Sequence, residues 1–179
     1  KADLDVDNII DAVIASNHTY SYTNPYLDIG LGSSYGIKRS YLKYEVLPTL
    51  TSADVIVEAT LTMKQLYYRS ISIPAEVHKV TDDWHSTTIT WADRPGYDPH
   101  VEDFVMGNSA VNYQWDVTDI VQDWYRSGIN NGMMFKAPDS VENGTTEKYR
   151  QFASSEYNIS NRPALSIKFL NNNGLESFW

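Results

Sequence analysis

Three polar side chains alternate along one short segment and could together bind a sugar polymer. Arg39, Tyr41 and Lys43 are each separated by one residue, and in a β-strand such residues project from the same face about 7 Å apart. The two cations could bind a polyanion such as a uronate or teichoic polymer, and the tyrosine offers an aromatic face. The alternative is that Arg39 and Lys43 pair across strands with some of the 23 acidic residues.

Tyrosine supplies a second candidate surface, because sugar-binding proteins commonly stack exposed aromatic rings on the C–H face of a pyranose. Tyr67 and Tyr68 end a predicted strand beside a turn, and Tyr20 and Tyr22 lie in a loop rich in Asn, Ser and Thr. Ordinary surface tyrosines are the alternative. The predicted carbohydrate-binding residues are Arg39, Tyr41, Lys43, Tyr67 and Tyr68. Four tryptophans lie inside strand and helix patterns and are predicted to pack in the core: Trp84, Trp91, Trp115 and Trp124.

Metal-binding patterns are weak. The four histidines, at positions 18, 78, 85 and 100, lack the spacing that would bring two imidazoles to one zinc ion. Acidic runs at 3–8 and 82–83 contain oxygen ligands that suit calcium, but neither has the glycine and terminal glutamate of an EF-hand loop. We therefore predict no metal site, favour solvated acidic turns over a structural calcium ion, and expect no required cofactor.

Catalytic motifs are absent from the sequence, which has no cysteine, no Gly-x-Ser-x-Gly elbow and no glycine-rich phosphate loop. Carboxylates at 82, 83, 102, 103, 116 and 119 could form an acid–base pair only if the fold brought two of them to within about 5–10 Å. Asp116 and Asp119 are better explained as residues at the start of a helix. We predict that the protein is not an enzyme, and a sandwich-type lyase or hydrolase is the weaker alternative.

Charge and hydropathy argue against two classes of partner. The chain has 179 residues and a formal net charge of -9, whereas phosphate contacts with nucleic acid need clustered Lys and Arg. No apolar run approaches the roughly 20 residues of a membrane-spanning helix. We therefore expect neither nucleic acid binding nor membrane insertion, and the length is usual for one β-rich domain.

Alternating apolar and polar residues predict an antiparallel β fold. Apolar residues recur at every second position over 55–63 and 165–169, as in strands with one buried face. The segment 39–46 alternates in the same way. Further strands are predicted near 11–16, 26–30, 71–77, 102–106, 111–116, 132–137 and 149–154.

One segment follows a helical period. The apolar residues over 117–124 are spaced i, i+3, i+4 and i+7, the stripe of an amphipathic helix. Asp116 or Thr118 can cap its start, and Gly128 offers a left-handed end. About ten strands with one short helix predict an all-β fold, a two-sheet antiparallel β-sandwich of the jelly-roll type.

Several motifs occur together in a fixed order. They are DAVI at 11–14, RSYLKY at 39–44, LP at 47–48, ATLT at 59–62, WHSTTITWADRP at 84–95, WDVTDIV at 115–121, NG at 131–132, SSE at 154–156 and RPAL at 162–165. In this order, over about 9–170, the chain resembles the DNRLRE domain, a bacterial and archaeal surface module related to carbohydrate-binding module family 96 and the disaggregatase-related repeats. The tail at 171–179 resembles the junction that leads into the Rhs/YD repeats of wall-associated proteins from Gram-positive bacteria.

That resemblance implies a jelly roll, a secreted, extracellular or cell-wall location, and binding of cell-wall or extracellular polysaccharide without catalysis. It also implies one domain over 1–170, followed by the start of a linker at 171–179 toward Rhs/YD repeats. The chain begins at Lys1 without Met, as expected for a module of a longer protein, and shows no signal peptide. The alternative is a spacer or protein-interaction domain, without a sugar ligand, that positions the Rhs/YD shell of a toxin.

Overall fold

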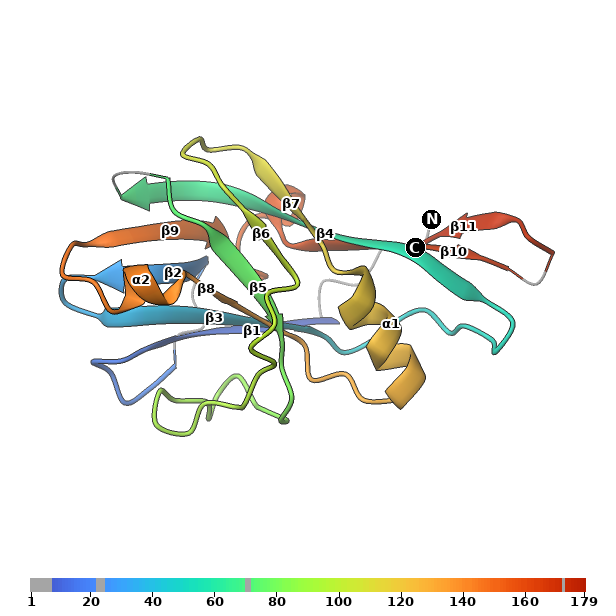
Figure 1. Ribbon diagram of the computed structural model, residues 1–179, viewed down its shortest axis with the longest axis horizontal. Coiled ribbons are helices and arrows are strands. Elements are labelled where there is room, and N and C mark those ends of the chain that lie inside the picture. Colours follow the sequence, from blue (N-terminus) through green and yellow to red (C-terminus); the bar gives the residue numbers. More distant parts are fainter. Residues whose placement is uncertain (1–7, 22–24, 70–71, 172) are drawn as a thin grey trace.

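The computed structural model describes residues 8–21, 25–69, 72–171 and 173–179, in which β-strands predominate (Figure 1). The strands are β1 (Ile9–Ala15), β2 (Tyr26–Gly32), β3 (Gly36–Tyr44), β4 (Val55–Arg69), β5 (Ala75–Lys79), β6 (Asp103–Val105), β7 (Asn112–Asp116), β8 (Met133–Lys136), β9 (Lys148–Ala153), β10 (Ala164–Leu170) and β11 (Glu176–Phe178). The helices are α1 (Thr118–Ser127) and α2 (Asp139–Glu142), with one 3-10 turn at Ile159–Asn161. Every segment predicted to be a strand thus overlaps a strand of the structure.

The described strands join edge to edge into one strongly curled antiparallel sheet, which forms a half-barrel (Figure 1). The strand order is β11-β10-β4-β9-β2-β3-β8-β5-β6, with β1 paired to β3 and β7 paired to β4. The predicted antiparallel β fold is confirmed, but the separation into two sandwiched sheets is not what the described strands show. The reason is the 15-residue β4, which pairs with β10 over its first half, with β7 at its middle and with β9 near its end. This strand connects what would otherwise be two sheets.

The main core lies between the curled sheet and α1. At its centre Trp115 is fully buried, and its ring meets Phe135 and Phe152 edge to face at 5.6 and 5.5 Å between centroids. The indole N–H of Trp115 donates to the Ala75 carbonyl at 2.8 Å, so its polar atom is satisfied inside the core. Trp84 and Trp124 are buried as well, which confirms the prediction that these tryptophans serve packing.

Helix α1 forms where the apolar stripe predicts it. Asp116 accepts a hydrogen bond from the backbone N–H of Thr118 at 3.0 Å, and the buried face ends at Trp124. Gly128 has φ 72°, in the left-handed region, and its N–H donates to the Trp124 carbonyl, which is the predicted helix end. Helix α2 was not predicted, because a single turn is too short to show a helical stripe.

A second, smaller core forms on the other face of β1 and β3. The segment 80–97, which we call the cover segment, passes below these two strands (light green in Figure 1). Its Trp84 and Ile89 pack with Ile14 and Tyr41 from the strands. The cover segment is fixed at its base by the bridge between Val80 and Tyr97, and the Trp84 indole N–H donates to the Asn131 carbonyl at 2.8 Å. Both faces of β3 are therefore buried.

The first part of β4 extends with β10 and β11 as an arm at one end of the molecule (Figure 1). A register shift between Lys168 and Phe169 leaves Val55 and Val57 exposed, although the alternation placed them on the apolar face. The tail, expected to begin a linker, contributes β11, which pairs with β10. Among the described residues, neither helix has the length and apolar character needed to span a bilayer.

Candidate functional site

The predicted row of Arg39, Tyr41 and Lys43 shares one face of β3, as expected, but this face lies under the cover segment. Arg39 is only 8% exposed. Its guanidinium donates to both carboxylate oxygens of Glu142 at 3.0 and 2.7 Å and lies 5.1 Å from the centre of the Trp91 ring. Arg39 is therefore a buried ion-pair residue, as the alternative prediction held, although Glu142 belongs to α2 and not to a neighbouring strand.

The other two members of that row also contact the cover segment. Tyr41 is fully buried, with its ring 5.6 Å from the Trp84 ring, and burial raises its pKa to about 12. Lys43 pairs with Asp83 at 3.3 Å and lies 5.5 Å from the centre of the Trp84 ring. The expected exposure of this row was wrong for Arg39 and Tyr41, because the period of a strand cannot reveal that a distant segment covers its polar face.

The opposite face of the sheet brings other side chains together through strand register. Gly30 of β2 is the direct cross-strand partner of both Tyr149 on β9 and Lys38 on β3, and directly opposed residues project to the same face. Gly30 has φ 112°, and a Cβ there would lie 2.3 Å from the Lys148 carbonyl oxygen, so the position requires glycine. Because Gly30 has no side chain, Lys38 and Tyr149 can meet across it.

The Lys38 ammonium is held by three groups. Its nitrogen lies 4.3 Å from the centre of the Tyr149 ring and 5.0 Å from that of Tyr35. It also pairs with one carboxylate oxygen of Asp28 at 3.1 Å. Cation–π attraction to both rings and the ion pair act together. One buried cation thus orients two tyrosine rings that come from different parts of the chain.

A hollow of about 320 Å³ opens beside this cluster. We call it the tyrosine hollow, and its lining residues are Val13, Ala15, Tyr26, Asp28, Tyr35, Lys38, Tyr149 and Gln151. The second carboxylate oxygen of Asp28 is buried and has no hydrogen-bond partner in the described part of the chain, so it is an acceptor without a donor. Aromatic faces with a few polar groups have the composition of a sugar-binding site.

Ring contacts continue past the hollow on both sides. Tyr149 lies 5.9 Å from the Tyr67 ring, while Tyr35 stacks on His18 at 4.6 Å and His18 meets the Tyr20 ring at 5.4 Å. All six members of this set are part of one chain of contacts, which we call the aromatic row: Tyr20, His18, Tyr35, Lys38, Tyr149 and Tyr67.

Two tyrosines singled out from the sequence, Tyr20 and Tyr67, lie at the two ends of the aromatic row. The side chain of Tyr68 and the whole of Tyr22 lie outside the described residues. Lys38, Tyr149 and Gln151 were not predicted. The alternation of Tyr149 and Gln151 along β9 was a usable signal, but only the register of β3, β2 and β9 shows that these residues lie near Lys38.

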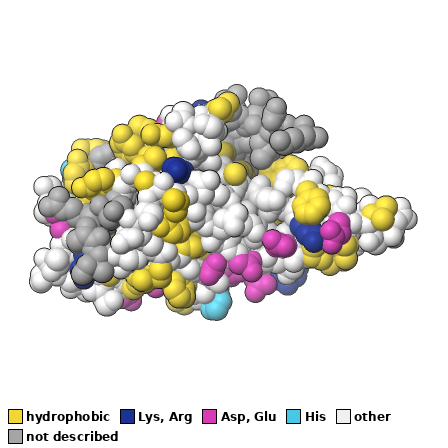
Figure 2. Space-filling view, turned by 90° about the horizontal axis from the view of Figure 1, so that it is seen from above, with side chains coloured by type: hydrophobic (Ala, Val, Ile, Leu, Met, Phe, Trp, Pro, Cys, Tyr) yellow, Lys and Arg dark blue, Asp and Glu magenta, His cyan; other side chains and the backbone are white. Residues whose placement is uncertain are grey.

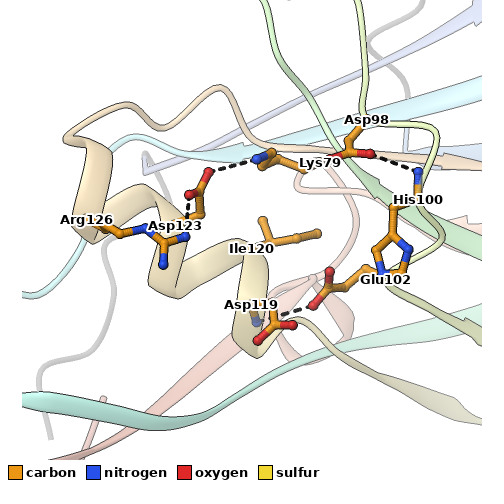
Figure 3. A pocket seen from close by; sticks show the side chains of 8 residues that line it. All are labelled: Lys79, Asp98, His100, Glu102, Asp119, Ile120, Asp123 and Arg126. Atoms are coloured by element: carbon orange, nitrogen blue, oxygen red, sulfur yellow. Dashed lines mark hydrogen bonds and ion pairs between the residues drawn. The ribbon is translucent and has the colours of Figure 1, made fainter.

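A second hollow, of about 180 Å³, lies between α1 and the chain that follows β5 (Figure 3). Asp123 binds both Lys79 and Arg126, at 2.8 and 2.7 Å. Glu102 accepts a hydrogen bond from the backbone N–H of Asp119 at 3.2 Å, and burial, followed by the charge of Asp119, raises the pKa of Glu102. No tyrosine or tryptophan is among its described lining residues, so this hollow offers a sugar no ring to stack on.

Seen from above, hydrophobic and acidic side chains lie on different parts of the surface (Figure 2). Hydrophobic side chains gather over the half of the molecule away from the β10–β11 arm, and acidic side chains gather near a histidine along one edge (Figure 2).

The carboxylates considered for catalysis or calcium have structural partners. Asp116 accepts a hydrogen bond from the Thr118 N–H at the start of α1, and Asp82 accepts one from the Gly96 N–H at 2.8 Å. Hydrogen bonding to Lys43 lowers the pKa of Asp83. Within the described residues, no group of three or more His, Asp or Glu side chains is placed to hold a metal ion. Residues 3–7 of the other acidic run lie outside the described ranges.

Comparison with known families gives one match. The model of carbohydrate-binding module family 96 matches residues 5–169, which is most of the chain. No curated protein sequence matches it. The match covers every element from β1 to β9 and most of β10.

Proposed function

Because the chain belongs to carbohydrate-binding module family 96, we propose that it binds a polysaccharide at the tyrosine hollow, with Tyr67 beside it. Membership in the family implies a non-catalytic module that binds carbohydrate. To this family property the proposal adds the binding site and the residues that contact the sugar. Tyr35 and Tyr149 stack on sugar rings, and Asp28 and Gln151 form hydrogen bonds with hydroxyl groups.

One observation carries this proposal: the Lys38 ammonium lies between the rings of Tyr35 and Tyr149 at the wall of the hollow. Rings that are already oriented lose less conformational entropy when a ligand binds. Lys38 is paired with Asp28, so the pair adds no net charge at this wall. Binding therefore relies mainly on stacking and hydrogen bonds, for neutral as well as anionic chains.

The five residues predicted from the sequence have different parts in this proposal. Tyr67 contacts the ligand from the end of the aromatic row, and Tyr68 stays a candidate because it neighbours Tyr67 in the chain. Arg39, Tyr41 and Lys43 support the cover segment on the opposite face, since they contact its residues Trp91, Trp84 and Asp83. Arg39 and Tyr41 could contact a ligand directly only if the cover segment moved away.

The ligand proposed is a cell-wall or extracellular polysaccharide, supported by the resemblance to DNRLRE surface modules. The same resemblance supports a secreted or wall-associated location and a parent protein with Rhs/YD repeats. We propose one domain over 1–170, with β11 as an extension of its sheet into 171–179. A spacer without a ligand is the outcome if no polysaccharide binds.

The test is affinity electrophoresis in gels that contain a soluble polysaccharide, followed by calorimetry on those that retard the protein. Suitable polymers are xylan, glucomannan, polygalacturonate, alginate and purified wall teichoic acid. Tyr149→Ala should abolish the retardation. Phe104→Ala is the matched control, because Phe104 is a ring exposed to 54% on β6, outside the aromatic row. Equal retardation of both variants would place the site elsewhere, and no retardation of the parent protein by any polymer would favour the spacer.

A further inference from the structure

The aromatic row is longer than the hollow at its centre. The lining of the tyrosine hollow includes Tyr35, Lys38 and Tyr149 but neither Tyr20 nor Tyr67. Each of these outer rings contacts the next member of the row, at 5.4 Å for Tyr20 with His18 and 5.9 Å for Tyr67 with Tyr149. Stacking surface is thus available beyond the hollow in two directions.

The members of the row that lie outermost are also the most open. Tyr20 is 55% exposed and Tyr67 is 45% exposed, against 42% for Tyr35, while Lys38 is buried and Tyr149 is half-buried. A site for a single sugar or for a chain end would need walls that close around the ligand. Here the ends of the row are open rings that could each cover a further sugar.

Different elements supply the row, which makes its continuity a property of the fold. Tyr20 and His18 follow β1, Tyr35 lies in the turn before β3, Tyr149 is on β9, and Tyr67 is near the end of β4. Every step along the row, including both contacts of Lys38, is between 4.3 and 5.9 Å. Each member of the row is thus in contact with the next.

On this basis we infer that the aromatic row binds one extended stretch of a polysaccharide, with sugars stacked on Tyr20 and Tyr67 as well as in the hollow, and not a monosaccharide or a chain terminus. The inference rests on the proposed function, because it assumes that the tyrosine hollow holds sugar. It adds the class of ligand, an internal chain segment of several sugars, and it assigns Tyr20 and Tyr67 to separate outer positions.

Chain length is the variable that tests this inference. Labelled disaccharides and hexasaccharides of the polymers named above are titrated into the protein and into three alanine variants. A disaccharide can occupy only the hollow, so Tyr149→Ala should weaken both lengths. Tyr20→Ala and Tyr67→Ala should weaken only the hexasaccharide, each by about three- to tenfold, the range expected for one lost aromatic contact.

The hexasaccharide should bind the unaltered protein at least about tenfold more tightly than the disaccharide, which corresponds to 1.4 kcal/mol. Phe104→Ala is again the control for loss of an exposed ring, and thermal unfolding confirms that each variant is folded. Equal affinity for both lengths would overturn the extended site, and so would a hexasaccharide affinity that neither Tyr20→Ala nor Tyr67→Ala changes. In either case a loss of binding in Tyr149→Ala would still support the hollow. If neither length binds in any series, the proposed function fails together with the inference.

Discussion

The Lys38 ammonium lies 4.3 Å from the centre of the Tyr149 ring, across a position where β2 carries only Gly30. Three strands must be in register for this contact to exist. The same cation pairs with Asp28 at 3.1 Å. Aromatic surface and charge are therefore linked at the place where the sheet leaves room for a ligand.

Replacement of Lys38 by methionine should weaken polysaccharide binding while the chain still folds. Lys38→Met keeps most of the volume but removes the attraction to Tyr35 and Tyr149, worth about 1 kcal/mol or about fivefold in Kd. It also leaves the Asp28 carboxylate without its partner. Calorimetry with the best-binding polymer measures the effect, and Lys38→Arg, which keeps a cation, should retain more affinity. Unchanged affinity in Lys38→Met would show that the cation does not orient the rings.

Loss of the buried ion pair on the other face should affect stability and not binding. Arg39→Ala leaves Glu142 buried without its cation, which typically costs about 3–5 kcal/mol. Lys43→Ala is the matched comparison, because its partner Asp83 is largely exposed and such pairs contribute roughly 0–1 kcal/mol. Urea unfolding of both variants provides the measurement. Similar small losses in the two would mean that Arg39 is not the structural residue that its contacts indicate.

Asp11 should make the stability of the fold depend on pH. Burial, followed by the charge of Glu156, raises the pKa of Asp11 to about 7, and its carboxylate accepts a hydrogen bond from the Ser155 N–H at 2.7 Å. The folded state therefore binds this proton more tightly than the unfolded state. Its contribution is fully present below about pH 4 and is lost as the pH rises through about 7. The loss is on the order of 4 kcal/mol.

Asp11→Asn tests this directly, because asparagine keeps an acceptor for Ser155 but cannot ionise. Thermal unfolding of both proteins between pH 4 and pH 8 should show a shallower decline for the variant. At pH 8 the variant should be the more stable of the two. If the stabilities of the two proteins changed in parallel with pH over this range, Asp11 would not be the group whose ionisation lowers the stability.

Truncation of Trp124 should remove a large part of the contact between α1 and the sheet. Trp124 is 3% exposed and completes the apolar face of the helix, so Trp124→Ala should cost about 3–5 kcal/mol. Chemical denaturation gives the change in the free energy of unfolding. An unchanged midpoint would contradict the packing of α1 in the main core.

Local patterns were sufficient to predict the strands and α1. Alternation along each strand and the helical spacing that ends at Trp124 depend on neighbouring residues only, and the left-handed Gly128 was visible as the end of the helix. The pairing of strand edges depends on the long β4 and could not be read from alternation. A curled sheet and a sandwich therefore looked alike in the sequence.

The candidate site was only partly predictable for the same reason. Tyr20 and Tyr67 were recognised as surface tyrosines by their flanking residues. Arg39 and Tyr41 were correctly predicted to share one face of a strand. The cover segment that buries them lies about forty to fifty residues further along the chain, so their burial could not be predicted. The buried Arg150 donates to the carbonyls of Ile73 and Val105, and these contacts between distant segments could not be read from any local pattern.

An NMR titration of the protein with labelled tyrosine rings tests the central claim most directly. The ligand is a hexasaccharide of the polymer that retards the protein most strongly. Binding at the tyrosine hollow predicts large shifts for the rings of Tyr35 and Tyr149, and little change for Tyr41 and Tyr44, which are buried away from the ligand. Shifts confined to Tyr97 at the end of the cover segment, with Tyr35 and Tyr149 unmoved at saturation, would contradict it.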